Sequence, residues 1–364
     1  MKALTVGGAM IDTIAVIANE RIERMTMRNA DTSFLLLEEG RKNEADDVST
    51  HCGGGAVNAA VALARLGCDV SALVKLGQDA RAETILARLA HEGVSTRYAV
   101  RDSRAPTGAS VLLSAHDRNA AIFTFRGANT LLEPADLKRD AFAVDLVYIS
   151  TLSNQSAACF PTLIDYAKAE GALVATNPGI RQLSARQGQF RDVVGKIDIL
   201  AINRHEAEAL VPWLVASVGE GGRPLQHKPG VDVPDLARRG FAAGGFELSL
   251  ASFFHALHQL GPRWVVVTDG KDGAYASAPS GVLHCSVAPA AIAGTAGAGD
   301  AFNATFAAYI AQSASAEDAV IAASINAASV IAYLDTQTGL LKRQELEARR
   351  APMAKSLKVT QWDR

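Results

Sequence analysis

Residues 293–310, AGTAGAGDAFNATFAAYI, place three glycines and an aspartate in front of an apolar helical pattern. Phe302, Phe306 and Ile310 recur at helical spacing, which predicts a helix that begins near Asp300. Glycines allow several backbone N–H groups to point at one spot, and the helix dipole adds partial positive charge there. The stretch therefore predicts an anion hole beside a carboxylate, the combination that phosphoryl transfer to an alcohol needs. Taken alone, Asp300 is equally well explained as a partner of the helix dipole.

A second glycine-rich helix start lies in residues 52–67, CGGGAVNAAVALARLG. The apolar spacing predicts a helix that stops at Gly67, and Asn58 in its first turn can donate and accept hydrogen bonds toward hydroxyl groups. A tight turn between a strand and a helix would explain the glycines equally well. Considered together, the two starts suggest one site for an acceptor and one for phosphates.

Two common phosphate-binding motifs are absent. The P-loop pattern G-x-x-x-x-G-K-[ST] does not occur, and Phe302 stands where G-x-G-x-x-G would need its third glycine. A P-loop ATPase or a nicotinamide-dependent enzyme is therefore disfavoured.

Short runs rich in Val, Ile and Leu alternate with helical patterns along the chain. The runs are ALTVGG (3–8), VSALVKLG (70–77), VDLVYIS (144–150), ALVATNPG (172–179), DILAIN (198–203) and WVVVTDG (264–270). Runs of this kind are typical of strands buried on both faces of a parallel sheet. Between them, residues 249–261 predict a helix capped by Ser249 and ended by Gly261. This alternation predicts an α/β doubly wound sheet with ligands at the carboxyl ends of its strands.

Three segments interrupt this alternation. Residues 18–51 are polar with a short β-like run, and residues 97–126 alternate as hairpin strands do, so both are predicted to form a small β-rich appendage. Residues 212–247 carry Gly and Pro clusters without steady periodicity, which predicts an inserted loop region.

Composition narrows the class of partner. The chain has 364 residues, is 49% hydrophobic and carries a net charge of −2, with no long run of like charges. Neither a nucleic acid nor a membrane is therefore expected as a partner, which leaves a small molecule. The apolar run before Asp12 is too short for a signal peptide, so a cytoplasmic location is expected. The four cysteines lack C-x-x-C spacing and are expected to be reduced and structural.

These residues resemble the ribokinase family of carbohydrate kinases, also called the PfkB family. GGGAVNAAVALARLG and GTAGAGDAFNATFAAYI look like its two signatures, and VGGAMID, NPG, INRHEAEAL, VVTDGKDG and INAAS fit the landmarks between and around them. The resemblance covers nearly the whole chain and implies an ATP-dependent kinase with a ribokinase-like doubly wound core and a small β-sheet lid. The core would comprise residues 1–17, 52–96 and 127–364, and the lid residues 18–51 and 97–126.

The resemblance also implies roles for individual residues. Asp300 matches the base that deprotonates the acceptor hydroxyl, and Gly297, Ala298 and Gly299 match the anion hole. Asp12 matches an aspartate that accepts hydrogen bonds from substrate hydroxyls, although it could also cap a turn. The residues that match the substrate-contacting first signature are Gly54, Gly55 and Asn58.

On the nucleotide side, the resemblance implies ATP and Mg²⁺. Asn203 and Glu206 match an N-x-x-E motif whose glutamate orients the water shell of the metal, although an acidic first helical turn would look the same. Thr268, Gly270 and Gly273 resemble the loop around the nucleotide phosphates and ribose, and Asn326 stands where the family borders the adenine.

The chain departs from the family pattern at several positions. Gly294 replaces the aspartate that usually precedes Thr295 and helps to hold a monovalent cation, which places potassium activation in doubt. Gly55 and Ser153 replace a lysine and a glutamate of ribokinase itself, which argues against ribose as the substrate. Arg126 lies on a return from the lid that borders the acceptor in the family, so it could pair with a carboxylate or phosphate on the substrate, or be merely solvated.

The leading hypothesis is a kinase that phosphorylates a primary hydroxyl of a sugar or sugar derivative. One alternative is a nucleoside kinase of the same family, which an aromatic platform formed by Phe34, Tyr98, Phe123 or Phe125 would favour. Another alternative is a non-catalytic ligand-binding protein on a kinase fold, against which the retained Asp300 argues. Exposed strand edges of the lid also predict a homodimer in which the lids pair edge to edge.

Overall fold

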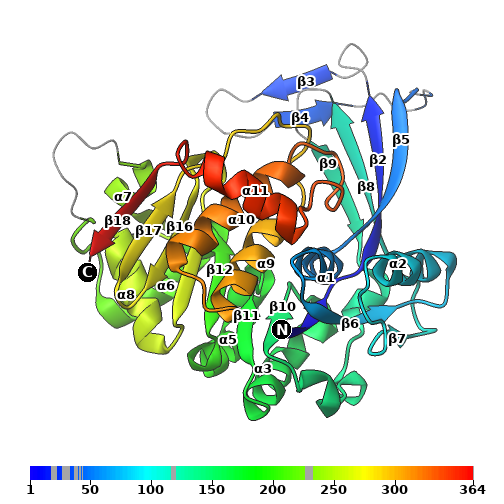
Figure 1. The fold of residues 1–364 in the computed structure, drawn as a ribbon, viewed down its shortest axis with the longest axis horizontal. Coiled ribbons are helices and arrows are strands. Elements are labelled where there is room, and N and C mark those ends of the chain that lie inside the picture. Colours follow the sequence, from blue (N-terminus) through cyan, green and yellow to red (C-terminus); the bar gives the residue numbers. More distant parts are fainter. Residues whose placement is uncertain are drawn as a thin grey trace.

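The computed structural model describes residues 1–17, 23–26, 33–36, 40, 42, 44–115, 120–225 and 233–363. Parts of the expected lid and insertion, namely residues 18–22, 27–32, 37–39, 41, 43, 116–119 and 226–232, lie outside the described residues. Two sheets dominate the architecture, a large one flanked by helices and a small one that projects from it (Figure 1).

The large sheet is doubly wound, as the alternating runs predict. In spatial order its ten strands are β18 (Val359–Asp363), β17 (Gly281–Cys285), β16 (Ala274–Ala278), β15 (Trp264–Thr268), β12 (Ile199–Asn203), β11 (Leu173–Thr176), β10 (Leu146–Ile149), β1 (Lys2–Gly7), β6 (Asp69–Leu76) and β7 (Val100–Arg101). All neighbours from β15 to β7 pair in parallel, and β15 to β18 pair antiparallel. The predicted runs all form parallel strands of this sheet.

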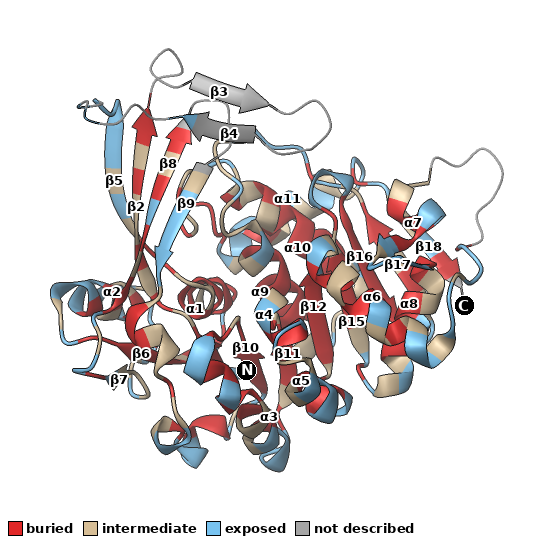
Figure 2. Ribbon diagram, turned by 180° about the vertical axis from the view of Figure 1, so that it is seen from behind, coloured by how far each residue is buried: buried red, intermediate tan, exposed pale blue. Residues whose placement is uncertain are grey.

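Alternate residues of the strands enter two separate cores. On β1 and β10, Ala3 and Leu146 face one core, whereas Leu4 and Val147 face the other. The first core is covered by α1 (Gly55–Arg65), α2 (Ala80–His91), α9 (Ala298–Ala311), α10 (Ala316–Val330) and α11 (Arg343–Met353) (Figure 1). The second is covered by α3 (Phe160–Ala169), α4 (Ile180–Leu183), α5 (Gln187–Val193), α6 (Arg204–Val218), α7 (Asp235–Arg239) and α8 (Leu250–Leu260) (Figure 2).

The small sheet has the strand order β5 (Asp47–Gly53), β2 (Met10–Ile17), β8 (Gly108–Ala115) and β9 (Ala120–Phe125). Its central strands β2 and β8 are more buried than the edge strands β5 and β9 (Figure 2). A separate hairpin is formed by β3 (Glu23–Thr26) and β4 (Ser33–Leu36). We call the four-stranded sheet the lid sheet.

The bounds of the lid sheet in the structure differ from those predicted from the sequence. Residues 10–17 were expected in the core, but they form β2 at the centre of the lid sheet, because β2 pairs with both β5 and β8. Residues 97–107 were expected in the lid, yet β7 pairs with β6 in the large sheet. Pairing between distant strands decides both assignments, and local periodicity cannot supply it.

The segment 212–247 contains more regular structure than expected. Helix α6 continues through Pro212 to Val218, α7 follows, and β13 (Phe241–Ala243) forms a hairpin with β14 (Phe246–Leu248). The apolar residues Leu236, Phe241 and Leu248 join the second core. Packing against this core therefore overrides the Gly- and Pro-rich local sequence.

Several local predictions are confirmed. Helix α8 is capped by Ser249, whose side chain accepts a hydrogen bond from the Ser252 amide, and it ends at Gly261. The four cysteines are buried and none forms a disulfide. Within the described residues, no helix combines the length and apolar character needed to cross a bilayer.

Candidate active site

The parallel strands β1, β10, β12 and β15 end at one edge of the large sheet, and the start of α9 lies at this edge with them. Gly297 caps α9 with φ 79°, a left-handed conformation that glycine adopts without strain. The N–H groups of the first helical turn have no partner within a helix, so those of Ala298 and Gly299 are available to an anion. A Cβ built on Gly299 would meet no atom within 4 Å, so this side of the turn is open.

Asp300 lies in the first turn of α9, with its carboxylate enclosed by the first glycine-rich start. Asn58 Nδ2 donates a hydrogen bond of 2.8 Å to Asp300 Oδ2. Gly55 leaves room for the other oxygen, because a Cβ at Gly55 would lie 3.4 Å from Asp300 Oδ1 and 2.9 Å from Ser150 Cβ. Burial raises the pKa of Asp300, the bond from Asn58 lowers it, and the charge of Asp12 raises it. A carboxyl group with a raised pKa is suited to act as a general base.

Asn58 is buried, and both its amide nitrogen and its amide oxygen form hydrogen bonds within the protein. Its Oδ1 accepts hydrogen bonds from Thr336 Oγ1 at 2.9 Å and from Gln337 Nε2 at 3.1 Å. Gln337 Oε1 in turn accepts a bond of 3.0 Å from Arg88 Nε. In this structure the amide of Asn58 is turned toward α9 and orients Asp300, and the contact with substrate that the first signature implies stays a prediction.

A pocket lies between the inner face of the lid sheet and the loop that precedes α9. It is lined by Met10, Asp12, Ile14, His51, Ser110, Leu112, Ile122, Thr124, Ala296, Leu334, Asp335 and Thr336. Asp12 stands opposite His51 on β5 and beside Ser110 on β8, and Ser110 Oγ donates a hydrogen bond to Asp12 Oδ1. Burial raises the pKa of Asp12, while the bond from Ser110 and the charge of His51 lower it. Carboxylate, hydroxyl and imidazole groups among apolar walls suit a polyol.

The other half of the site is built at the ends of β12 and β15. Asn203 pairs with Thr268 in the sheet, which brings the N-x-x-E segment beside the expected nucleotide loop. Asn203 caps α6 and forms a capping box with Glu206, whose Oε2 also accepts a bond of 3.1 Å from Asn177 Nδ2. Glu206 is buried, which raises its pKa, and bonds from Asn203 and Asn177 lower it.

Glu206 is the residue in this half that could serve a metal. Its Oε1 forms no hydrogen bond within the described part of the chain. The described residues contain no group of three or more His, Cys, Asp or Glu side chains arranged to hold an ion. A single free carboxylate oxygen fits a Mg²⁺ ion held mainly by water and phosphate oxygens, which is the usual preference of this metal.

The other residues expected to contact the nucleotide are two glycines in a turn and one buried asparagine. Gly270 and Gly273 have φ of 55° and 95° and form the turn after β15, next to Thr268. Asn326 is fully buried in α10, where its Nδ2 donates to Thr305 Oγ1 and its Oδ1 accepts from the Leu341 amide. The side chain of Asn326 is thus engaged within the core, and its place beside the adenine stays a prediction.

Gly54 and Arg126 are the two other residues that were expected to contact the acceptor. Gly54 caps α1 against the backbone of Gly8, and its position therefore serves close packing. Arg126 follows β9 and is partly buried.

Five residues of the site were not predicted from the sequence: Ser110, His51, Thr336, Gln337 and Asn177. Of these five, Asn177 alone lies in a recognisable motif, the NPG landmark. The other four are brought to the site by strand pairing and loop packing, which leave no local pattern in the sequence.

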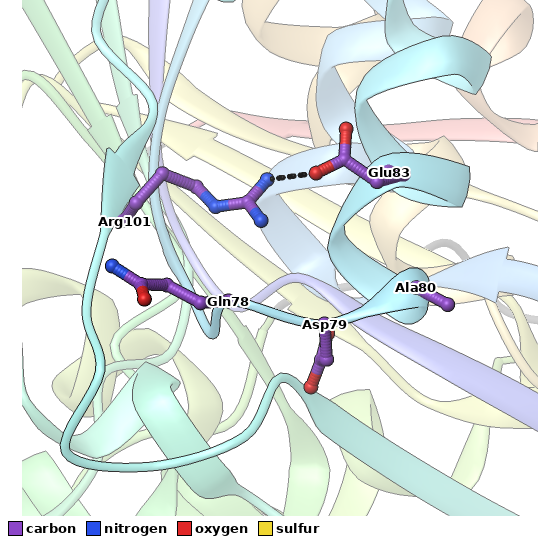
Figure 3. A pocket seen from close by; sticks show the side chains of 5 residues that line it. All are labelled: Gln78, Asp79, Ala80, Glu83 and Arg101. Carbon is purple, nitrogen blue, oxygen red and sulfur yellow. Dashed lines mark ion pairs between the residues drawn. The ribbon is translucent and has the colours of Figure 1, made fainter.

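A second hollow lies beside the start of α2, away from this site. It is lined by Gln78, Asp79, Ala80, Glu83 and Arg101, and an ion pair of 2.9 Å joins Arg101 to Glu83 (Figure 3). Asp79 caps α2 and accepts bonds from Thr107. Its charged groups are therefore engaged within the protein, and we assign no chemistry to this hollow.

Known proteins share both the sequence pattern and the fold. The chain is 29% identical over 331 residues to a deoxyribokinase of Salmonella typhi, covering 89% of this chain and 94% of that protein. It is 26% identical to a ribokinase of Bacillus subtilis, covering 81% and 86% of the two chains. The structure of Arabidopsis thaliana ribokinase complexed with ribose and ATP matches with a TM-score of 0.71 at 20% identity, covering 96% of this chain and 98% of that one.

The family assignment rests on most of the chain. The sequence model of the pfkB family carbohydrate kinases matches residues 22–216 and 246–343, which include both glycine-rich helix starts. Together with the carboxylate placed beside open helix amides, this match leads to one conclusion: the chain belongs to the pfkB family of carbohydrate kinases and is a phosphotransferase with an alcohol group as acceptor.

Proposed function

We propose that the protein transfers the γ-phosphate of ATP to a primary hydroxyl of a sugar or sugar derivative, with Asp300 as the base. The observation that carries the proposal is the position of Asp300, which lies in the first turn of α9 beside the open amides and is electrostatically coupled to Asp12 of the lid sheet. The acceptor would lie in the pocket beneath the lid sheet, and the nucleotide along the ends of β12 and β15.

Each residue group would perform a separate part of the transfer. Asp300 takes the proton from the acceptor hydroxyl, whose oxygen attacks the γ-phosphorus as the bond to the β-phosphate oxygen breaks and ADP leaves. The amides of Gly297, Ala298 and Gly299 stabilise the negative charge that develops on the phosphoryl group. Asp12 accepts hydrogen bonds from other hydroxyl groups of the acceptor. When bound, Mg²⁺ would supply positive charge that offsets the charge of the phosphates, and Glu206 would order its water shell.

The pocket favours a sugar over a nucleoside. Among the described residues that line it there is no Phe, Tyr or Trp on which a base could stack. Phe123 and Phe125 are exposed and follow the opposite alternation on β9 from the lining residues Ile122 and Thr124. Phe123 and Phe125 therefore do not form the aromatic platform that would favour a nucleoside kinase, and Tyr98 does not line the pocket. The side chain of Phe34 lies outside the described part of the chain.

The test is ADP release with ATP and Mg²⁺ against sugars, sugar acids, sugar phosphates and nucleosides, with and without potassium. Asp300→Asn serves as the blank, because it removes the base while the helix amides remain. We expect one class of acceptor to give turnover that falls about 10²- to 10⁴-fold in the variant, with ADP binding retained. Turnover that is unchanged in Asp300→Asn would refute this mechanism, and ATP binding without turnover of any acceptor would favour a binding protein.

We also propose that the protein is a homodimer paired through the outer faces of two lid sheets, in place of the edge-to-edge pairing that the strand edges suggested. Val48, Val111, Phe123 and Phe125 are exposed on one face, and Val111 pairs directly with Phe123. Apolar groups gathered on the outside of a sheet suit burial against a second copy. Light scattering should give twice the chain mass, and Phe123→Asp should give the single chain mass. A monomer mass for the unmodified protein at micromolar concentration would contradict the proposal.

A further inference from the structure

The loop that joins α10 to α11 contacts two walls of the candidate active site. Leu334 packs against the apolar cluster of the lid sheet that contains Ile14. Two residues later the loop lies against the start of α9, because a Cβ on Gly297 would stand 2.7 Å from Thr336 Cβ. Asp335 stands between these two contacts and lines the acceptor pocket. The loop therefore holds a carboxyl group where the lid sheet and the start of α9 approach one another.

The carboxyl group of Asp335 has one oxygen engaged and the other free. The residue is 8% exposed. Its Oδ1 accepts hydrogen bonds from the Gln337 amide at 2.8 Å and from the Thr338 amide at 2.7 Å. Its Oδ2 forms no hydrogen bond within the described residues. Because the two bonds to Oδ1 fix the orientation of the carboxyl group, Oδ2 is a fixed hydrogen-bond acceptor in the wall of the pocket.

A role in the loop turn alone does not explain a carboxylate at this position. Aspartate and asparagine both stabilise such turns through one side-chain oxygen, so the amides of Gln337 and Thr338 need neither a second oxygen nor a charge. Burial raises the pKa of Asp335, but the bonds from these two residues and the charge of His51 lower it below its usual value. A buried carboxylate oxygen without a partner costs free energy, which a hydroxyl donor from a ligand would recover.

The pocket has a carboxylate on each of its two sides. Asp12 lies on β2 of the lid sheet, whereas Asp335 lies on the core side. No Lys or Arg side chain is among the described residues that line the pocket. Carboxylate oxygens accept hydrogen bonds from hydroxyl groups, and they repel carboxylates and phosphates strongly where water is largely excluded. The lining therefore suits an uncharged acceptor with hydroxyl groups directed toward both the lid sheet and the core.

We infer that Asp335 binds a hydroxyl group of the acceptor on the side opposite Asp12, and that the acceptor is an uncharged sugar and not a sugar acid or a sugar phosphate. This inference rests on the proposed function, because it takes the pocket beneath the lid sheet as the acceptor site. Asp335 is then a specificity-determining residue. It selects among sugars by a hydroxyl group that is not phosphorylated, and its charge disfavours anionic acceptors.

The experiment combines Asp335→Asn with matched acceptors. Asparagine keeps a side-chain oxygen for the turn and places an NH₂ group, which accepts no hydrogen bond, where Oδ2 was. Glucose is compared with gluconate and the single-deoxy glucoses, and ribose with ribonate and the single-deoxy riboses. Kinetics of ADP release and calorimetric binding without ATP are measured for both proteins. Asp192→Asn is the control, because Asp192 is exposed on α5, which covers the opposite core.

We expect the unmodified protein to favour a neutral sugar over its acid by about tenfold or more in kcat/KM. Asp335→Asn should raise the KM for that sugar by about 10- to 100-fold, the loss expected of one hydrogen bond to a charged group, while kcat changes less than about threefold. For the deoxy analogue that lacks the bound hydroxyl group, Asp335→Asn should leave the KM unchanged. The preference over the acid should also shrink, because the variant removes a negative charge from the pocket. Asp192→Asn should behave as the unmodified protein.

A purely structural role of Asp335 gives a different pattern. Asp335→Asn would then raise the KM by the same factor for the parent sugar and for every deoxy analogue, or would lower kcat alone through the loop that contacts Asn58, and either result would overturn the inference. The comparison of glucose with gluconate on the unmodified protein needs no variant, and faster turnover of the acid would overturn the uncharged acceptor.

Failure of this inference differs from failure of the proposed function. Turnover of a neutral sugar that requires Asp300 but is unaffected by Asp335→Asn would overturn the inference and leave the kinase proposal standing. Calorimetric binding of a neutral sugar that is lost in Asp335→Asn, without turnover, would support the inference while the kinase proposal fails. Absence of binding and of turnover with every sugar of both series would overturn the inference.

Discussion

The two glycine-rich helix starts look alike in sequence and serve different purposes in the structure. At α1, Gly54 and Gly55 are packed: the Ala56 amide donates to Gly8 O, and a Cβ on Gly55 would lie 3.0 Å from Ser150 Oγ. At α9, a Cβ on Gly299 would meet nothing within 4 Å. Glycine at α1 therefore allows protein to approach protein, whereas glycine at α9 leaves space and free amides for a ligand. The comparison teaches that a glycine signature shows close approach without showing what approaches.

The largest expected difference between the two starts is in stability. Gly55→Ala forces a methyl group against Ser150, which should cost about 1–3 kcal/mol of unfolding free energy. Gly299→Ala meets no protein atom and gains helix propensity, so its stability should be equal or up to about 1 kcal/mol higher. Its KM for ATP should nevertheless rise about tenfold, because the methyl group occupies space proposed for the phosphates.

Urea unfolding and ATP kinetics of both variants measure this contrast. Ser150→Gly removes the two side-chain atoms nearest to the added methyl group, so the double variant Gly55→Ala/Ser150→Gly should recover part of the lost stability. Equal destabilisation by Gly55→Ala and Gly299→Ala would show that the two starts are used in the same way.

The next largest effect is expected where the two starts touch, at the bond from Asn58 to Asp300. Asn58→Ala removes a donor that stabilises the charged carboxylate, so the pKa of Asp300 should rise further. Because the base acts when deprotonated, the acidic limb of the pH dependence of kcat should move to higher pH, with a loss of about 10- to 30-fold near neutral pH.

The pH profile of Asp12→Asn provides the opposite comparison. The charge of Asp12 raises the pKa of Asp300, so its removal should move the acidic limb to lower pH whatever happens to KM. If the acidic limb moves in the same direction in both variants, the limb does not report the ionisation of Asp300.

The raised pKa of Asp300 should also affect the stability of the folded protein. The pKa of Asp300 is raised above its unfolded value of 3.8, so the folded protein loses stability as pH rises through the interval between the two values. Asp300→Asn removes this cost and should raise the melting temperature at pH 8 by about 1–3 °C, with a smaller gain near pH 4. Calorimetry at the two pH values measures the difference, and a lower melting temperature at pH 8 would contradict the assigned sign.

The smallest effect is expected one step further from the base. Gln337→Leu removes a bond to Asn58 Oδ1 but leaves the bond from Thr336, so kcat should fall about two- to fivefold with a small shift of the acidic limb to higher pH. Arg88→Met, which breaks the outer bond to Gln337 and an ion pair with Glu92 but no bond to Asn58, should leave kcat and the limb unchanged. An effect of Gln337→Leu on KM alone would indicate contact with substrate and not positioning of the base.

Elements with local signals can be predicted from the amino-acid sequence alone. Strands of the parallel sheet, the bounds of α8 between Ser249 and Gly261, and the start of α9 within two residues of Asp300 all follow from apolar spacing and caps. These signals act between residues within a few turns of one another, so the chain specifies them before any tertiary contact forms. The family signatures singled out Asp300, Glu206 and Asp12 because these motifs, too, are short stretches of consecutive residues.

The contacts that those residues make depend on long-range packing. Asn58 and Asp300 are 242 positions apart, and Asp12 and Ser110 are 98 apart, so neither bond has a local signal. The same holds for the pairing that places β2 in the lid sheet and for the bond from Asn326 of α10 to Thr305 of α9. Side-chain direction and long-range register depend on the packing of the whole fold, because each polar group turns toward the partner that satisfies it once water is excluded.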